Sequence, residues 1–151
     1  MKVKQISVSI ENSHDRLYEF TKALADHGIN LRALNLVDTG YLGELRILVS
    51  DVATARQILM QKEIPGRVDD VVAVEIEDQP GQFSRLLKDL MDANIKIKYS
   101  YACAGMNSGT AVMIFCFSDN DQAIEVLRGK NVRLLDFEAF DGFEAASRKA
   151  G

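Results

Sequence analysis

ISVSIENSHDRLYEFTKALADHGINLRALNL, residues 6–36, has a second copy in the same chain: VAVEIEDQPGQFSRLLKDLMDANIKIKYSYA, residues 72–102. The identities include Ile10-Glu11 with Ile76-Glu77, Lys22 with Lys88, Leu24 with Leu90, Asp26 with Asp92 and Ile29 with Ile95. Gly43 falls on Gly109 without a gap, and a two-residue insertion after it aligns Ser50-Asp51 with Ser118-Asp119, Ala55 with Ala123, Leu59 with Leu127 and Lys62 with Lys130. An internal repeat fixes the organisation of a fold. We therefore predict one module at residues 1–70, a second at 71–140 and a flexible tail at 141–151.

The composition is that of an ordinary globular protein. The chain has 151 residues, of which 47% are hydrophobic and 26% charged, and its net charge is −4. This acidic balance argues against binding to nucleic acid or to an anionic membrane, and no apolar run is long enough to span a bilayer. Cys103 and Cys116 form neither a CxxC pair nor a disulfide framework. They are typical of reduced thiols, so we expect a cytoplasmic protein.

In the first copy, the apolar spacing alternates between strand and helix periods. Ile6, Val8 and Ile10 alternate with Gln5, Ser7 and Ser9, which predicts a strand with one wet face. A helix follows, with an inward stripe at Leu17, Phe20, Ala23 and Leu24, and it ends at Gly28. Two further strands are expected at Ile29, Leu31, Ala33 and at Leu45, Ile47, Val49, and then a helix capped by Asp51 with Val52, Ala55, Ile58 and Leu59 on one side.

The second copy repeats this order. Asn94 stands where the first copy has Gly28, and it is the next most tolerant residue for a left-handed conformation. The helix stripe is Phe83, Leu86, Leu87, Leu90 and Met91, and the next strand alternates at Ile95, Ile97, Tyr99 and Tyr101. A turn at 104–109, a strand at 110–117 that is apolar on both faces, a helix capped by Asp119 and a last strand at 132–140 complete the copy. The expected fold is therefore α+β: two ferredoxin-like βαββαβ modules side by side, with one continuous antiparallel sheet of about eight strands and the four helices on one face. Between Lys62 and Val72 there is room only for a short fourth strand, which should merge into the first strand of the second copy.

The turn between the first strand and the first helix carries the most specific chemistry. It reads ENSHDRL from Glu11 in the first copy and EDQPGQF from Glu77 in the second. Pro80-Gly81 at a helix start presets φ and lets the backbone approach a ligand closely. The exposed N–H groups of the first turn can bind a carboxylate, although most such loops are plain helix caps.

The pattern as a whole resembles the ACT domain, a small-molecule-sensing module of amino-acid metabolism. The matching features are a strand ending in Glu-Asn or Glu-Asp, the Pro-Gly helix start, and the Gly-Ile-Asn or Asn-Ile-Lys step into the second strand. The resemblance covers nearly all of residues 3–140 and is closest to stand-alone tandem ACT proteins. It implies a non-enzymatic regulatory protein, a homodimer, that binds a small amino acid at the seam between modules.

The resemblance also implies ligand-binding residues. In ACT domains similar to those of phosphoglycerate dehydrogenase, an Asn of the first loop and an Asn at the second strand hold the effector, and these positions match Asn12 and Asn30. A side-chain amide offers both a donor and an acceptor to a zwitterion. The second copy has Asp78 and Lys96 there, which can address the ammonium and the carboxylate instead. The first copy has His14-Asp15 in place of Pro-Gly. The expected ligand-binding set is Asn12, Ser13, His14, Asn30, Asp78, Gln79, Pro80, Gly81, Gln82, Phe83 and Lys96.

Other functions are less consistent with the residues. His14 and His27 lack metal-ligand spacing with the cysteines, and no nucleophile and base stand together, so we expect no metal, no cofactor and no catalysis. Acylphosphatases share the topology but need an anion-binding Arg, which only Arg16 matches. RNA-recognition motifs share it too, yet Phe115 and Phe117 are in phase with Met113 and should face the core. The alternative function is a regulatory subunit or adaptor that binds an enzyme of amino-acid biosynthesis, similar to the small subunit of acetolactate synthase. The amino acid, and whether one or both modules bind it, stay open.

Overall fold

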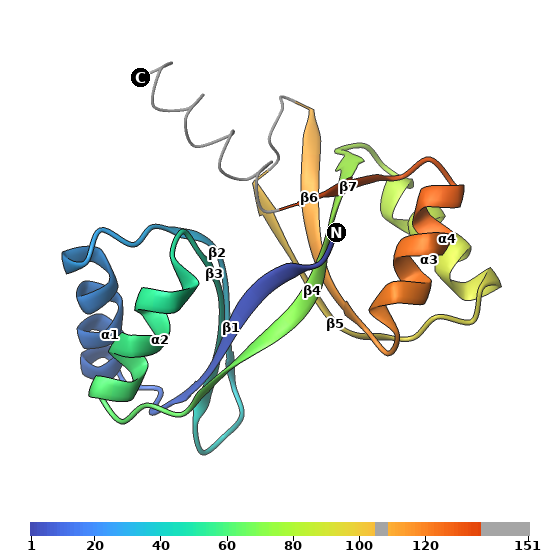
Figure 1. Ribbon diagram of the computed structural model, residues 1–151. Helices are drawn as coiled ribbons and strands as arrows, with labels where there is room; N and C mark the ends of the chain where they lie inside the picture. The colour runs from blue at the N-terminus through green and yellow to red at the C-terminus, as the bar shows by residue number, and fades with distance from the viewer. Residues whose placement is uncertain (105–108, 137–151) are drawn as a thin grey trace. The chain divides into compact units, whose positions relative to one another are not determined.

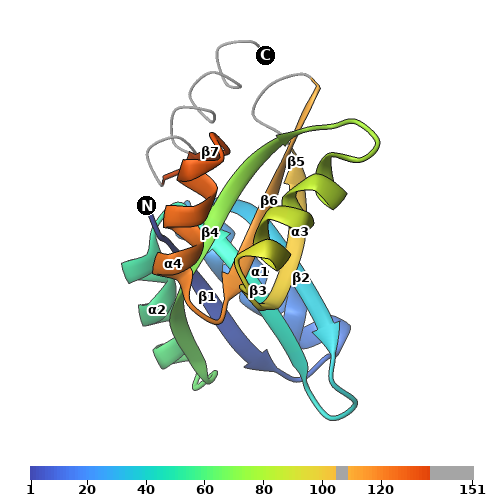
Figure 2. The same ribbon diagram turned by 90° about the vertical axis from the view of Figure 1, so that its right-hand side faces the viewer.

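The computed structural model describes residues 1–104 and 109–136, and these form two compact units. One unit, Lys4–Asp69, is called the first module below. The other, Met1–Val3 with the described residues from Asp70 to Asp136, is called the second module. In each module two helices cover one face of an antiparallel sheet (Figures 1 and 2). The expected α+β fold of two ferredoxin-like modules is confirmed.

The first module contains β1 (Val3–Ile10, of which Val3 belongs to the second module), α1 (His14–Asp26), β2 (Leu31–Asp38), β3 (Gly43–Val49), α2 (Val52–Gln61) and the first residues of β4. The strand order is β2-β3-β1-β4, so β2 is an edge strand. The helix-facing side carries a cluster that includes Ile6, Val8, Phe20, Leu24 and Ile47, all at most 2% exposed. The predicted inward set is confirmed here.

The second module contains the rest of β4 (Gly66–Glu77), α3 (Gln82–Asp92), β5 (Ile97–Ala104), β6 (Thr110–Phe117), α4 (Asn120–Gly129) and β7 (Arg133–Leu135). Its core includes Val72, Val74, Leu86, Leu90 and Phe115. Leu87 and Met91, expected in the helix stripe, are 36% and 68% exposed, so that part of the prediction is wrong. Phe83, also in the expected stripe, is 40% exposed, and the buried residues of α3 are Leu86 and Leu90.

The merged strand between the copies is confirmed. β4 runs from Gly66 without a break to Glu77, and residues 66–69 belong to the first module. Part of the expected turn at 104–109, the last strand beyond Asp136 and the tail at 141–151 lie outside the described residues.

Local signals at the helix ends act as predicted. Asp51 and Asp119 cap α2 and α4 by accepting from the N–H groups of Thr54 and Gln122. After α1 and α3, Gly28 and Asn94 take the left-handed conformation, with φ of +70° and +55°.

The position of the two-residue insertion differs from the sequence alignment. β1 pairs with β3 so that Ile10 lies opposite Gly43, and β4 pairs with β6 so that Ile76 lies opposite Ala111. Because Ile10 and Ile76 are equivalent, Gly43 corresponds to Ala111 and not to Gly109. The two extra residues of the second copy therefore lie before Ala111, in the connection between β5 and β6, where they leave the strand ladder undisturbed.

A register shift changes which residues of the second strands share a face. It lies between Leu31 and Ala33 in β2, and between Ile97 and Tyr99 in β5. The extra residue moves Tyr99 and Tyr101 to the side of the sheet away from the helices, while Ile97 packs in the core. The expected alternation of Ile97, Tyr99 and Tyr101 on one face is therefore wrong.

The face of each sheet opposite its helices is called the helix-free face. In the first module it includes Gln5, Ser7 and Arg46, and in the second Val71, Ala73, Val112 and Ile114. Gln5 and Ser7 are 0% and 1% exposed, so the prediction of a wet strand face is wrong. Gln5 Nε2 donates to Ser7 Oγ, and Ser7 Oγ in turn donates to Asp69.

Candidate functional site

The first loop of the first module presents Asn12 above the start of β3. Asn12 is exposed, and its Cβ would lie 3.2 Å from a Cβ added to Gly43. Leu36 Cδ1 would be equally close, at 3.2 Å. Only glycine therefore fits under Asn12 without a shift. The cap of α1 is Ser13, whose Oγ accepts from Arg16 N at 3.3 Å, and not Asn12. His14 begins the helix and is exposed.

The first loop of the second module is held differently. Asp78 N donates to the Gly109 carbonyl at 2.8 Å, and Gly81 takes φ +89° at the N-terminus of α3. The N-cap residue Gly81 has no side chain to cap this helix, in contrast to Ser13 at the start of α1. Residues 78–81 are exposed, and Gln82 is half-buried. Phe83 is 40% exposed, and its ring stacks on Phe115 at 6.4 Å between centroids.

Asn30 and Lys96 occupy equivalent positions before the second strands. Ser50 N donates to the Asn30 carbonyl at 3.1 Å, and Ser118 N donates to the Lys96 carbonyl at 2.9 Å. Asn30 N also donates to Ser50 Oγ at 2.9 Å. Both residues are exposed, so either side chain is accessible to a ligand.

Asn12 and Asn30 do not meet within the first module. Asn12 lies at Gly43, where β3 begins, and Asn30 is bonded to Ser50, directly after β3 ends at Val49. A strand rises about 3.3 Å per residue, which separates the two positions by roughly 20 Å. Asp78 and Lys96 are separated in the same way, at Gly109 and Ser118. One small ligand can contact both members of such a pair only if they come from different modules.

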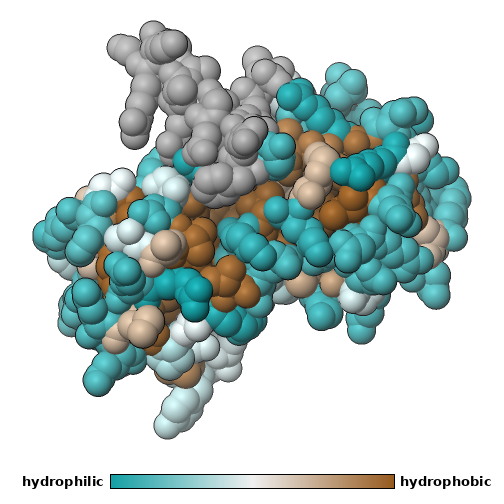
Figure 3. Space-filling view, viewed as in Figure 1, coloured by the Kyte–Doolittle hydropathy of each residue, from teal (hydrophilic) through white to brown (hydrophobic). Residues whose placement is uncertain are grey.

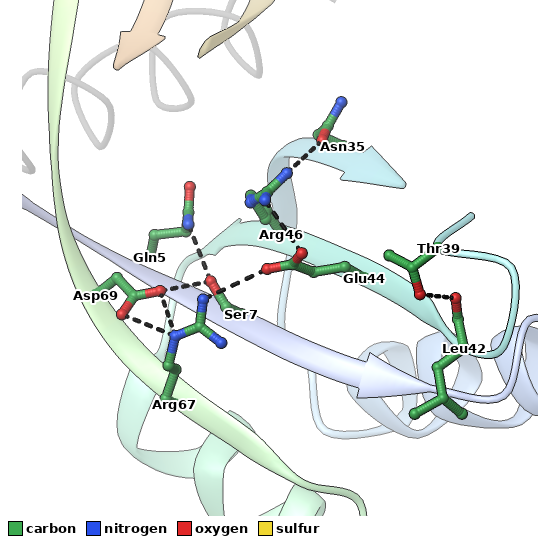
Figure 4. Close-up of polar contacts among 9 residues, drawn as sticks. All are labelled: Gln5, Ser7, Asn35, Thr39, Leu42, Glu44, Arg46, Arg67 and Asp69. Carbon is green, nitrogen blue, oxygen red and sulfur yellow. Dashed lines mark hydrogen bonds and ion pairs between the residues drawn. The ribbon is translucent and has the colours of Figure 1, made fainter. Parts of the chain in front are cut away.

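A polar network on the helix-free face of the first module was not predicted (Figure 4). Ser7 Oγ donates to Asp69 Oδ2 at 2.7 Å, and Gln5 Nε2 donates to Ser7 Oγ at 3.1 Å. Arg67 pairs with Asp69 at 3.1 Å and with Glu44 at 3.4 Å. The charges of these two carboxylates raise the pKa of Arg67, against the lowering effect of its partial burial.

The network continues across β3 to β2. Arg46 pairs with Glu44 at 3.2 Å and donates to Asn35 Oδ1 at 3.2 Å. The hydroxyl of Ser7 has a carboxylate as acceptor and no histidine near it in the network, so it is not an activated nucleophile. Polar residues at every second position, such as Glu44 and Arg46, indicate a polar face in the sequence. The partners of these residues cannot be predicted in the same way, because they depend on the strand register.

The residues considered for acylphosphatase activity and for RNA binding make contacts within the fold instead. Arg16 Nη1 pairs with Glu19 at 3.2 Å instead of lying free in an anion-binding loop. Phe115 and Phe117 are buried and stack at 5.1 Å between centroids, so they face the core as predicted.

Two features are absent from the described part of the chain. Residues 1–104 and 109–136 contain no group of three His, Cys, Asp or Glu side chains placed to hold a metal ion. In the same residues, every helix is too short or too polar to cross a membrane.

Two ferredoxin-like modules that share the continuous strand β4 define the class of tandem α+β repeat folds. The family model of the ACT domain pair matches residues 1–141, and the chain belongs to this family.

Solved structures agree with this assignment. Protein BT0572 from Bacteroides thetaiotaomicron is 36% identical with a TM-score of 0.84, over 89% of this chain and 92% of that one. The regulatory subunit of aspartate kinase from Thermus thermophilus, in its ligand-free form, has the same fold at 15% identity and a TM-score of 0.60, over 83% of this chain and 90% of that one. No curated protein sequence matches the chain.

Proposed function

We propose that this protein is a non-enzymatic, cytoplasmic regulatory protein that binds a small amino acid through its ACT modules. The observation that carries the proposal is the placement of Asn12, an exposed amide above the start of β3, where Gly43 leaves room for it. A side-chain amide can donate to the carboxylate of an amino acid and accept from its ammonium group. Membership of the ACT domain pair family supports the same ligand class.

The separation of Asn12 from Asn30 supports a site shared by two modules, which a homodimer would supply. Asn12 of one copy and Asn30 of a second copy would then contact the same ligand. Edge strand β2 offers a surface for such an approach, because Leu34 and Leu36 on it are 55% and 39% exposed. The β2–β3 hairpin next to it projects at the lower edge of the first module as pale and brown atoms (Figure 3). Ligand binding would order this contact and change what the protein presents to a partner.

The test begins with a thermal-shift screen of the twenty amino acids at millimolar concentration. A ligand that binds only the folded protein raises its melting temperature by mass action. The best amino acid is then titrated by calorimetry into Asn12→Ala and Asn30→Ala. Losing a hydrogen bond to a charged group costs about 1.5–3 kcal/mol, so each variant should bind about ten- to a hundredfold more weakly.

Gln61→Ala is the matched control, because it removes an exposed amide at the end of α2, which has no role in the proposed site. It should bind as the unaltered protein does. Unchanged affinity in both asparagine variants would end the claim for this site. A screen in which no amino acid shifts the melting temperature would favour the alternative of an adaptor that binds an enzyme.

A further inference from the structure

The second module contains a cavity of about 490 Å³ between α3, the end of β4 and the turn from α4 to β7. Figure 2 shows these elements around the front of the module. Charged groups of both signs line it: Glu77 from β4, Arg85 and Asp89 from α3, and Lys130 from the turn. A volume of this order fits a small molecule. Apart from Gln82, the cavity uses none of the residues expected to bind ligand at the first loops.

The equivalent place in the first module is bridged by an ion pair. Lys62 Nζ lies 3.0 Å from Glu19 Oε1, which joins the turn after α2 to α1. Two observations establish that the positions correspond. The pairs Lys22–Asp26 and Lys88–Asp92 have the same 2.8 Å distance on α1 and α3. The turns after α2 and α4 each contain a left-handed residue, Glu63 at φ +54° and Asn131 at φ +58°.

In the second module this bridge cannot form. Arg85 replaces Glu19 and Lys130 replaces Lys62, so two cations line the same cavity. Like charges repel, so Arg85 and Lys130 form no counterpart of the Glu19–Lys62 ion pair. Lys130 is left with a long contact to Asp89, at 3.8 Å.

Two of the lining charges have no ion-pair partner among the described residues. Arg133 pairs with Glu75 at 3.6 Å, and Lys130 with Asp89. The side chains of Arg85 and Glu77 form no ion pair or hydrogen bond with any residue among 1–104 and 109–136. One positive and one negative group therefore remain at the cavity. A molecule that carries one charge of each sign matches them.

We propose that this cavity is a second binding site, for a free α-amino acid or a similar small zwitterion. Arg85 and Lys130 bind its carboxylate, and Glu77 binds its ammonium group. Arginine is suited to the first role because its guanidinium can donate two parallel hydrogen bonds to one carboxylate. The site goes beyond the first-loop proposal, since it uses neither Asn12 nor Asn30 and stands if that proposal fails.

The test follows the backbone amide signals of the full chain by two-dimensional NMR while each of the twenty amino acids is added. At least one amino acid should shift the signals of Arg85 and Asn131 in a saturable way. Acetate and ethylammonium each carry one of the two charges, so both should bind at least tenfold more weakly. Shifts as large with acetate alone would overturn the zwitterion site.

Arg85→Glu places an acid opposite Lys130, as Glu19 stands opposite Lys62, and should close the cavity. It should weaken binding at least tenfold without loss of melting temperature. Lys88→Glu is the matched control, because it makes the same change of charge on α3 outside the cavity lining. It should bind normally. Equal affinity in the unaltered protein and Arg85→Glu, or equal loss in both variants, would overturn the proposal.

The same spectra separate this site from the first-loop site. If the cavity signals shift and Asn12→Ala and Asn30→Ala change no binding, the cavity site stands and the first-loop proposal fails. If the two asparagine variants abolish all binding and the cavity signals never shift, the cavity proposal fails.

Discussion

The helix-free faces of the two modules come from one repeat but differ in chemistry at equivalent positions, although the second also carries the buried Glu75. The first module has Gln5, Ser7 and Arg46 there, joined by hydrogen bonds and ion pairs. At the equivalents of Ser7 and Arg46 the second module has Ala73 and Ile114, both 0% exposed. The helix-facing sides, in contrast, are apolar in both modules. The side of a sheet that packs against two helices must be apolar. The other side can be either apolar or polar, provided that its buried polar groups are hydrogen-bonded.

The two solutions should fail in different ways. On an apolar face a truncated side chain leaves a cavity, and the cost grows with the volume lost. In a polar network a truncated side chain leaves its partner without a hydrogen bond, and the cost depends on what else that partner contacts. The predictions below test this contrast.

The largest effect is expected for Ile114→Ala on the apolar face. Ile114 is 0% exposed, so the substitution should lower the free energy of unfolding by about 2–5 kcal/mol. Urea denaturation followed by circular dichroism measures the change. Leu36→Ala on β2, where the side chain is 39% exposed, is the control and should cost clearly less. Similar losses in the two variants would show that the buried face contributes no special packing.

Exchanging serine and alanine at the equivalent positions 7 and 73 should lower the free energy of unfolding by unequal amounts. Ser7→Ala removes a donor from Asp69, which still pairs with Arg67, and an acceptor from Gln5, which has a further contact, so it should cost about 0.5–1.5 kcal/mol. Ala73→Ser buries a hydroxyl on the apolar face and should cost about 1–3 kcal/mol. The comparison of the two urea midpoints decides the matter. A smaller loss for Ala73→Ser than for Ser7→Ala would contradict the contrast between the faces.

The smallest effect concerns pH and the Glu19–Lys62 pair. The hydrogen bond and charge of Lys62 lower the pKa of Glu19 from its ordinary value of 4.5. Stability from this carboxylate is therefore present above its unfolded pKa and is lost as the pH falls through the lowered, folded pKa. Melting temperatures measured across the acid range should fall less steeply for Glu19→Gln. Arg85→Gln, at the equivalent place in the second module, should follow the unaltered protein, and a difference there would refute this reading.

Much of the fold was predictable, because it rests on local patterns. The alternation of Ile6, Val8 and Ile10 defines a strand, and Asp51 and Asp119 cap helices by contacts three residues away. The extra residue after Leu31 was not predictable, since a bulge needs a partner strand to be defined. The burial of Gln5 was not predictable for a similar reason, because the strands that cover a polar side chain are known only once the sheet has formed.

The candidate site was predictable in part. Asn12 is exposed at a loop and Gly43 lies under it, but nothing in their spacing shows that Asn30 lies at the far end of β3. The replacement of Glu19 by Arg85 is visible in the aligned copies. Its meaning depends on Lys62 and Lys130, which only the folded chain brings near those positions.

The division of the chain between the modules has a consequence for the order of folding during synthesis. Every residue of the first core cluster lies between Ile6 and Val68, so this core can form once that segment has left the ribosome. Met1–Val3 belongs to the second module, and Lys2 pairs with Asp121 at 3.1 Å. Lys2 must therefore wait until Asp121 has been translated before it reaches its native partner.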